Sequence, residues 1–280
     1  MMFYDPDFTP LHINATHEDM KGNNGHGRYL FVPGSNSRAR QISDFFNDVT
    51  AVRRCSRGHD LYLGTITRDG ITIDVGAIST GMGTPSVDII LNELLKLGGR
   101  KFLRLGTCGL LQPEFMKGGD LAIATAAVRD DHATRCYVPS EYPATVAYEM
   151  QLAASMAVAN SSSGRKAHFG LVHTKSSLYA REFRQGALAG ENSAYMDMLT
   201  RAGVIASEME AAMLFVLANM ADSLRKDRDP KSPQRVFAGT MCAVLGEGDD
   251  FGDKAEVTHM IEDLIELGIA TFIELNKMGY

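Results

Sequence analysis

The sequence feature that most limits the fold of this chain is the alternation of two apolar patterns. Short runs rich in β-branched residues end at glycine, proline or Asp-Gly, and longer segments between them repeat apolar residues at helical spacing. This alternation is typical of an α/β domain, in which helices cover a central sheet. It therefore predicts an α/β fold with a large mixed sheet.

The positions of the predicted elements follow from these patterns. Strands are predicted at residues 28–32, 60–67, 71–79, 101–105, 120–126, 167–174, 203–206 and 235–245. Helices are predicted at residues 85–97, 146–159, 193–202, 208–224 and 254–278. The pair Asp69-Gly70 predicts a tight hairpin between the second and third strands. Thr84 is the expected N-cap of the first helix, with Pro85 at its first position.

Length and composition indicate one soluble domain. The chain has 280 residues, of which 45% are hydrophobic, and no linker divides them, so we expect a single domain over residues 1–280. The polar stretch 222–234 is expected to form a solvated loop. The net charge of −6 argues against a nucleic-acid partner. The sequence has no apolar run long enough to span a membrane and no signal-peptide pattern. We therefore expect a cytoplasmic protein that binds no membrane.

The four cysteines are scattered, with no CxxC pair and no histidine spaced for a zinc site. We expect each to be a small buried residue rather than a disulfide partner or a metal ligand. Cys108 could be proposed as a nucleophile because it lies within GTCG. No sequence feature marks a base for it, so the buried role is favoured.

Three glycine-bounded turns follow predicted strands, where an α/β sheet usually binds its ligands. They are Pro33-Gly34-Ser35, which leads to Arg38, and residues 79–84 and 104–109. The second contains GMGTPS, which falls short of the dinucleotide fingerprint GxGxxG and lacks an acidic ribose partner. A dinucleotide-dependent oxidoreductase is therefore a distant alternative.

Arg104 lies inside an apolar run, where a guanidinium is costly to bury unless it meets an anion. An ion pair with a carboxylate would be the simplest explanation of a lone arginine. Arg104 is not alone, because Thr107 can add donors and Arg38 follows another glycine turn. Guanidinium groups bind phosphate through paired donors, so these residues predict a phosphate site.

The segment Ser207-Glu208-Met209-Glu210 lies between a short predicted strand and an apolar helix. Carboxylates in the first turn of a helix ordinarily cap it, and capping explains one of the two glutamates. The other can hold two vicinal hydroxyls, as on ribose, while Met209 packs on the sugar or base. The segment therefore predicts a ribose site.

The motifs STGMGTPS, FLRLGTCG and SEMEAAML, in this order, resemble those of nucleoside phosphorylases of the uridine phosphorylase and hexameric purine nucleoside phosphorylase type. The resemblance extends from about residue 11 to about residue 245. It implies a three-layer α/β/α sandwich, built as a homodimer or an assembly of dimers with shared active sites. It also implies nucleoside and inorganic phosphate as substrates, with no organic cofactor.

The resemblance assigns roles to individual residues. The phosphate-binding residues are Gly34, Arg38, Arg104 and Thr107, with Arg57 or, as a competitor, His59 reaching across from the partner subunit. The ribose-binding residues are Thr107, Met209 and Glu210, with His12 from the partner subunit. The base-binding residues are Gly109, Leu178, Glu182, Arg184 and Glu208. Family members can bind a cation between subunits, for which Asp60 and Ser86 are the nearest matches.

Base recognition departs from the family pattern. Uridine phosphorylases hold uracil with a Gln-x-Arg, where this chain has Glu182 and Arg184. A carboxylate can accept the uracil N3–H but cannot donate to O2. A second family arginine corresponds here to Leu245 or Gly246. The acidic residues nearest to the acid-catalyst position of the purine enzymes are Glu247, Asp249 and Asp250.

These expectations together describe phosphorolysis of uridine to uracil and ribose 1-phosphate in pyrimidine salvage. Catalysis is assigned to Arg104 at the phosphate, Glu210 at the ribose and Arg184 at the departing base. The nearest alternative is a purine nucleoside phosphorylase or a nucleosidase of the same superfamily, although a nucleosidase needs no phosphate-binding arginines. A non-catalytic nucleoside sensor on the same fold would bind ligand without turnover.

Overall fold

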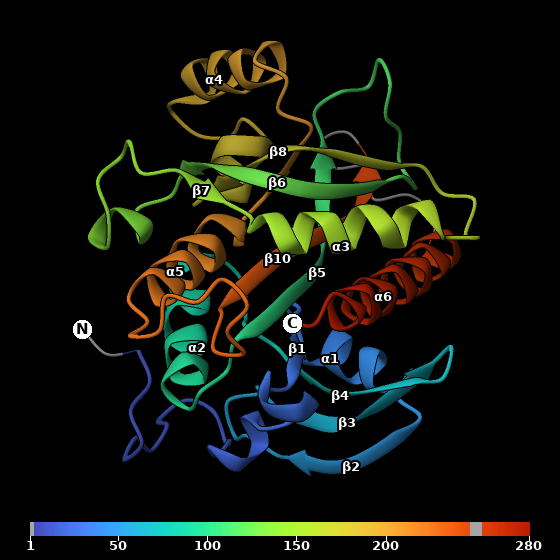
Figure 1. Ribbon diagram of the computed structural model, residues 1–280. Helices are drawn as coiled ribbons and strands as arrows, with labels where there is room; N and C mark the ends of the chain where they lie inside the picture. The colour runs from blue at the N-terminus through green and yellow to red at the C-terminus, as the bar shows by residue number, and fades with distance from the viewer. Residues whose placement is uncertain (1–2, 247–253) are drawn as a thin grey trace.

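The computed structural model describes residues 3–246 and 254–280, and a mixed β-sheet forms its centre (Figure 1). The strands are Tyr29–Phe31 (β1), Asp48–Arg53 (β2), Leu61–Arg68 (β3), Ile71–Ile78 (β4), Lys101–Leu110 (β5), Leu121–Asp130 (β6), Ala144–Thr145 (β7), Ala167–Lys175 (β8), Ala206–Glu208 (β9) and Phe237–Gly246 (β10). The α-helices are Asn36–Ser43 (α1), Thr84–Lys96 (α2), Tyr148–Ala159 (α3), Ala189–Arg201 (α4), Ala211–Ser223 (α5) and Lys254–Lys277 (α6). Shorter helical turns cover Glu18–Met20, Asn23–Gly25, Thr134–Cys136 and Leu178–Glu182.

The sheet has a closed part and an open part. Strand β5 pairs with β10, β10 with β6, β6 with β8, β8 with β9, and β9 returns to β5, so these strands form a ring. The open part continues from β5 through β1, β4 and β3 to the edge strand β2. Parallel and antiparallel pairs both occur, which confirms the predicted mixed sheet. Strand β5 belongs to both parts and is therefore central.

Helices cover both faces of the sheet around β5, as expected for a three-layer arrangement. Helix α3 packs on α6 and α2 packs on α5, and Figure 1 shows these pairs on either side of β5 and β10. Successive side chains of a strand point to opposite faces. Accordingly, Phe102 lies against Gly99 just after α2, whereas Leu105 lies against Gly268 in α6. None of the helices in the described ranges is both long and apolar enough to cross a membrane.

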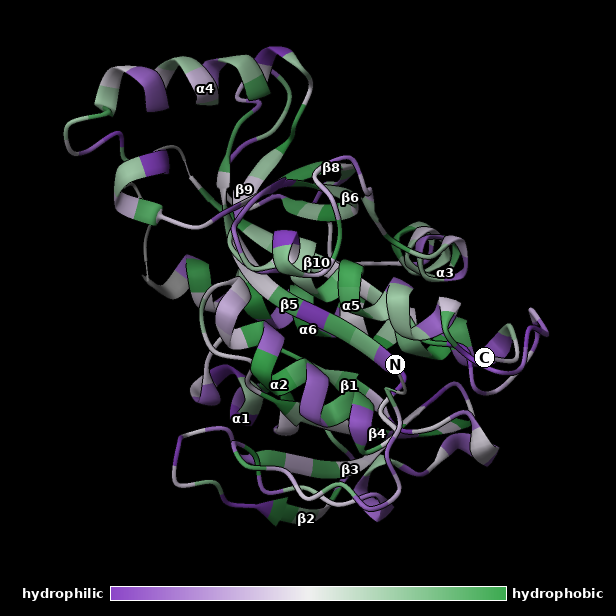
Figure 2. Cartoon of the chain, turned by 90° about the vertical axis from the view of Figure 1, so that its left-hand side faces the viewer, coloured by the Kyte–Doolittle hydropathy of each residue, from purple (hydrophilic) through white to green (hydrophobic). Residues whose placement is uncertain are grey.

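Helix α4 stands away from the sheet at one end of the molecule, as Figures 1 and 2 both show. It packs on its own small apolar cluster of Met196, Leu199 and Val204, separate from the main core. The turn Leu178–Glu182 contacts α4. The segment that leads from β8 to α4 therefore belongs to a lobe of its own.

The predicted hairpin between β3 and β4 is confirmed. The strands are antiparallel from Leu61 opposite Ile78 to Arg68 opposite Ile71. Asp69 and Gly70 have positive φ values of 53° and 76°. Two central residues with positive φ are what a type I′ turn requires.

The predicted turn at residues 104–109 is wrong, because β5 continues as a strand to Leu110. Pairing with β10 and β9 holds this stretch extended. Its glycines leave room for side chains instead of turning the chain. A Cβ atom at Gly106 would lie 3.1 Å from Nη2 of Arg104, and one at Gly109 would lie 2.0 Å from Oε1 of Glu182.

The expected role of Thr84 as the N-cap of α2 is also wrong. The cap is Gly83, whose φ of 80° suits glycine, and Thr84 is the first helical residue. The N–H of Gly83 donates to Oε1 of Glu210 at 2.7 Å. A carboxylate distant in sequence thus satisfies the helix start, and no local pattern could have indicated it.

The elements that the sequence patterns miss are short or polar. Helix α1 carries few apolar residues, although Ser35 caps it by accepting the Arg38 N–H at 3.2 Å. Strand β2 is a largely exposed edge strand, and β7 has two residues. Apolar periodicity has little to detect in segments of this kind.

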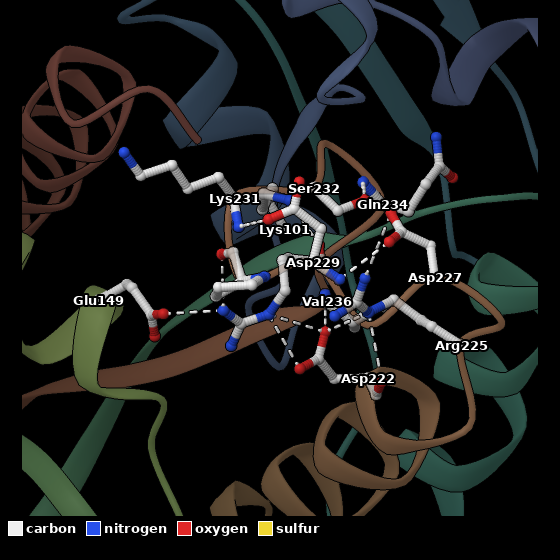
Figure 3. Close-up of polar contacts among 12 residues, drawn as sticks. Lys101, Glu149, Asp222, Arg225, Asp227, Asp229, Lys231, Ser232, Gln234 and Val236 are labelled. Carbon is white, nitrogen blue, oxygen red and sulfur yellow. Dashed lines mark hydrogen bonds and ion pairs between the residues drawn. The ribbon is translucent and has the colours of Figure 1, made fainter.

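The polar stretch after α5 is anchored more firmly than the expected solvated loop (Figure 3). Asp222 accepts the Val236 N–H at 2.8 Å and pairs with Nε of Arg225 at 2.8 Å and Nε of Arg235 at 3.0 Å. Arg235 also reaches Glu149 in α3 at 2.8 Å. The fully buried Lys101 donates a hydrogen bond to the backbone carbonyl of Arg235. Burial lowers the pKa of Lys101 to about 7.

We predict that Asp222→Asn destabilises the protein by about 2 kcal/mol, because the substitution leaves a partly buried group of cations without its central carboxylate. The midpoint of urea unfolding at pH 7 measures the effect. The matched control is Asp229→Asn, an exposed carboxylate of the same loop, which should change stability by less than about 0.5 kcal/mol. Equal effects of both substitutions would show that Asp222 does not hold the loop.

Candidate active site

A cavity of about 340 Å³ opens where β5, β9 and β10 approach the turns after β1 and β8. Its lining comprises Gly34, Ser35, Arg38, Met82, Arg104, Leu105, Gly106, Thr107, Cys108, Gly109, Lys175, Leu178, Glu182, Ser207, Glu208, Met209, Glu210, Leu245 and Gly246. Residues from widely separated parts of the chain therefore meet here. Charged groups of both signs converge in this cavity, and several of them are buried.

Arg104 is the buried cation at one end of the cavity, with 5% of its surface exposed. It forms an ion pair with Glu210, and its Nε lies 3.6 Å from Oε2 of Glu208. Burial opposes its charge, but the two glutamates outweigh burial and raise the pKa of Arg104. Its Nε and Nη1 atoms have no hydrogen-bond partner. Arg104 is therefore a permanent cation with donors to spare.

Arg38 lines the same end from α1 and is partly buried. Burial, and next the charge of Arg104, lower the pKa of Arg38. No carboxylate among the described residues forms an ion pair with it. This end of the cavity therefore holds two cations that repel each other, and Arg104 has unused donors. Such an arrangement is suited to an anion.

Glu210 lines the cavity beside Arg104 and is 4% exposed. One carboxylate oxygen accepts the Gly83 N–H, and the other binds Arg104. Glu208 beside it accepts the N–H groups of Glu210 and Ala211 at 2.9 and 2.8 Å, and the Thr174 hydroxyl at 2.5 Å. Glu208 thus has the capping role, and burial followed by the charge of Glu210 raises its pKa.

The far end of the cavity is formed by Gly109, Leu178, Glu182 and Lys175. The bare Cα of Gly109 admits the Glu182 carboxylate, which would otherwise meet a Cβ atom at 2.0 Å. Glu182 forms an ion pair with Lys175, which is 2% exposed. Gly109 lies five residues beyond Arg104 on β5, about 16 Å along an extended strand. The lining of the cavity therefore follows β5 from Arg104 to Gly109.

Cys108 has the buried role that the sequence favoured. Its thiol is enclosed, and the hydrogen bond with Cys242 together with burial raises its pKa well above the ordinary value. A thiol held protonated in this way is a poor nucleophile. All four cysteines are free, and Cys242 is buried like Cys108. The expected burial is wrong for Cys136, which is exposed, and Cys55 is only partly buried.

A model of the phosphorylase superfamily matches residues 28–225, a stretch that includes every charged residue of this cavity. The chain belongs to the phosphorylase superfamily. Among its relatives, it is 35% identical to the uridine phosphorylase of Thermococcus kodakarensis, over 82% of this chain and 77% of that protein. It is 32% identical to the uridine phosphorylase of Haemophilus influenzae, over 75% and 80% of the two chains. The guanosine phosphorylase of Halorubrum lacusprofundi is 31% identical, over 85% and 88%.

Most of the residues predicted for the phosphorylase site meet in the cavity. These are Gly34, Arg38, Arg104, Thr107, Gly109, Leu178, Glu182, Glu208, Met209 and Glu210. Leu245 and Gly246, where the family has its second arginine, also line it. Glu247, Asp249 and Asp250 lie outside the described residues. The motifs FLRLGTCG and SEMEAAML supply six of these ten residues, so the structure brings these two motifs to one cavity.

Arg184 is not brought into the cavity. Its backbone has a positive φ of 57°, its side chain is 51% exposed, and Nη2 lies 3.5 Å from Oδ1 of Asp197 in α4. Its neighbour two residues earlier, Glu182, does reach the cavity. Of the two residues that correspond to Gln-x-Arg, Glu182 therefore lines the cavity and Arg184 lies outside it.

His12 and Arg57 lie outside the cavity of their own chain. Nδ1 of His12 is 2.7 Å from Oε1 of Glu93, whose carboxylate also accepts the backbone N–H groups of residues 11–13. Arg57 is exposed in the turn between β2 and β3. The two segments touch, because the Cys55 thiol lies 3.2 Å from the His12 carbonyl. His12 and Arg57 therefore belong to one surface region.

The pair suggested for a cation does not form a ligand set within one chain. Asp60 binds Arg54 at 2.7 Å, the Cys55 N–H at 2.8 Å and the Asn36 amide at 3.3 Å. The Ser86 hydroxyl donates to the Thr80 carbonyl at 2.6 Å. Within residues 3–246 and 254–280, no group of three or more His, Cys, Asp or Glu side chains could hold a metal ion.

Sequence reasoning missed Lys175. It is the last residue of β8 and follows the polar pair His173-Thr174, so it does not interrupt an apolar run as Arg104 does in β5. Its partners Glu182, Ser207 and Glu208 are brought to it by the fold, and the sequence pattern does not indicate them.

We predict that inorganic phosphate stabilises the protein through Arg38 and Arg104. At a phosphate concentration one hundred times Kd, binding to the folded state adds about 2.7 kcal/mol to the free energy of unfolding. This gain corresponds to a Tm several degrees higher. Thermal unfolding is measured in phosphate and in sodium chloride of equal ionic strength. Arg38→Gln should abolish the difference, whereas Arg40→Gln, an exposed arginine of the same helix, should retain it. An undiminished shift in Arg38→Gln would place the anion elsewhere.

Proposed function

We propose that this phosphorylase-superfamily enzyme is a uridine phosphorylase, which transfers ribose from uridine to inorganic phosphate. The observation that carries the proposal is the pair Arg38 and Arg104, which meet at one end of the cavity with unused guanidinium donors. An attacking water molecule needs no such cations, but an attacking phosphate does. The relatives named uridine phosphorylase support uracil as the base. The proposed setting is pyrimidine salvage in the cytoplasm.

The order of groups along the cavity supports a mechanism. Phosphate lies at the Arg38 and Arg104 end, near Gly34 and Thr107. Glu210 and Met209, which also line the cavity, hold the ribose hydroxyls and the sugar face. The C1′–N1 bond breaks toward an oxocarbenium-like sugar, and a phosphate oxygen bonds to C1′. Glu210, whose carboxylate is fixed by Gly83 and Arg104, keeps the ribose oriented without reorganising.

A role for Arg184 at the base requires a rearrangement. Its guanidinium would have to leave Asp197 and turn from the surface into the cavity. The positive φ of Arg184 points the same way, since a strained backbone position is often found beside a site that changes conformation. Arg184 therefore remains a proposed base ligand only for a closed form.

We predict that uridine is converted to uracil and ribose 1-phosphate only when phosphate is present. The assay follows uracil release by liquid chromatography across a phosphate titration, with ribose 1-phosphate quantified in the same samples. Base release at an equal rate in phosphate-free buffer would identify a nucleosidase instead. A protein that binds uridine without turnover under both conditions would be a sensor.

Guanosine is the second candidate substrate, and Glu182 is the observation that favours it. Guanine presents two adjacent donors, N1–H and N2–H, that one carboxylate can accept together. Uracil offers the carboxylate N3–H alone. A relative named guanosine phosphorylase covers most of the chain. The same assay with guanosine and inosine decides between the bases, because faster turnover of guanosine than of uridine would refute the uracil assignment and leave phosphorolysis intact.

We further propose that each active site is completed by a second subunit of a homodimer or an assembly of dimers. His12 and Arg57 lie together on the surface, away from the cavity of their own chain. In a two-fold dimer, this region of each subunit can contact the active site of the other subunit. Asp60 and Ser86 remain the proposed ligands of a cation at that interface.

We predict that two inactive variants complement each other in mixed dimers. Arg57→Ala removes the crossing phosphate ligand and Arg38→Ala removes one held within the chain, so each pure variant loses activity. After joint unfolding and refolding, about half the dimers are mixed, and each has one complete site of two. Activity should therefore recover to about a quarter of wild type. No recovery, with mixed dimers verified by mass spectrometry, would show that Arg57 does not cross.

A further inference from the structure

Lys175 is a buried ammonium group at the far end of the cavity from the arginines. Its Nζ pairs with Glu182, lies 3.0 Å from Oγ of Ser207 and lies 3.3 Å from the carbonyl of Glu208. Ser207 stands opposite Gly109 in the register of β9 and β5, so Lys175 is at the Gly109 end. Burying an ammonium is costly, and a surface ion pair would have avoided that cost.

A chain of hydrogen bonds behind Lys175 fixes its direction. Ser207 Oγ lies 3.1 Å from Nδ1 of His173, and Nε2 of His173 lies 3.0 Å from Oδ2 of Asp130. Arg181 closes the chain by binding the same Asp130 oxygen at 2.7 Å. Burial lowers the pKa of His173, which favours the neutral ring. With Nε2–H donated to Asp130, Nδ1 accepts from Ser207, and the Ser207 oxygen is left to accept from Lys175.

The order Asp130, His173, Ser207 has the connectivity of a hydrolytic triad, but its serine is not a nucleophile. Ser207 is 1% exposed, and the oxygen that would attack is the acceptor for Lys175. These three residues are therefore positioning residues, which act on the substrate only through Lys175.

We propose that Lys175, held beside Glu182, is the catalytic residue that stabilises negative charge on the departing base. The three N–H groups of Lys175 face Glu182, Ser207 and the Glu208 carbonyl, and the last of these contacts, at 3.3 Å, is the one that a base carbonyl would replace. The pair then presents a donor next to an acceptor, which matches the C=O and N–H of a lactam base such as uracil or guanine. Lys175 thus supplies the hydrogen-bond donor that the carboxylate of Glu182 lacks. The inference rests on the proposed nucleoside phosphorolysis and extends it to the base.

Negative charge develops on the base during the reaction, and Lys175 is the cation that can stabilise it there. As the C1′–N1 bond of uridine breaks, its electron pair passes to the base and spreads over N1, O2 and O4. The new bond forms between C1′ and a phosphate oxygen, and the proton of hydrogen phosphate finally resides on uracil N1. An ammonium beside a carbonyl oxygen gains attraction as that charge develops, so it lowers the barrier more than it strengthens binding. Lys175 needs no rearrangement to reach the cavity, in contrast to Arg184.

The test compares leaving groups in Lys175→Met. The fluorine of 5-fluorouridine lowers the pKa of the base, so its departure needs less stabilisation. We expect kcat for uridine to fall about 100-fold, kcat for 5-fluorouridine to fall much less, and KM for phosphate to remain unchanged. Lys166→Met, an exposed lysine just before β8, is the matched control and should behave as wild type. Equal losses for uridine and 5-fluorouridine would reduce Lys175 to a structural role and overturn the proposal.

A second measurement uses the unaltered enzyme, in case Lys175→Met does not fold. A nucleoside is held in one orientation by its ribose, so cytidine and adenosine place an unprotonated ring nitrogen opposite Glu182 and an amino group opposite Lys175, where uridine and guanosine place N–H and C=O. Calorimetry without phosphate should therefore show binding of uridine or guanosine at least tenfold tighter than binding of cytidine and adenosine. Comparable binding of all four nucleosides would overturn the inference. The uridine assay with phosphate reports separately on the proposed function, because lactam selectivity can hold even if guanosine is the faster substrate.

Discussion

The carboxylate of Glu210 is the interaction on which the rest of this structure depends. One oxygen satisfies the start of α2 at Gly83 and the other neutralises the buried Arg104 on β5, while the Glu210 backbone is the N-cap of α5. A guanidinium in the centre of the sheet would be strongly destabilising without this partner. The same contact joins β5 to the helix pair on one of its faces. In the function proposed above, folding and ligand binding therefore use a common group.

Arg104 shows how a fold can hold a cation ready for an anion. Its two glutamates keep it charged, yet they leave Nε and Nη1 without hydrogen bonds. Arg38 adds a second positive charge that no described carboxylate offsets. The anion thus removes a repulsion and satisfies buried donors at once, so the site is organised before its ligand arrives.

The sequence predicts this site better than it predicts the local geometry. Arg104 is identified because it is a charged residue inside an apolar run, and Glu210 because it is one of two glutamates at the start of an apolar helix. The turn predicted around Arg104 is wrong, since Gly106 and Gly109 are needed for space beside Arg104 and Glu182, and sequence shows no distances. The cap at Gly83 and the contact of Lys175 with Ser207 depend on contacts between distant segments. Arg184 matches a family position, but its orientation is set by Asp197 and the α4 lobe.

The two ends of the cavity come from different parts of the chain, and this separation affects how such a protein can diverge. The anion end is built from residues 34, 38 and 104 on the central sheet and its first helix, whereas the other end comes from residues 175–182, next to a lobe with its own apolar cluster. If the proposed function holds, substitutions in that lobe alter which heterocycle is accepted while Arg38 and Arg104 stay unchanged. One nucleoside could then replace another in evolution through few substitutions, and identity over the whole chain would be a weak guide to the base.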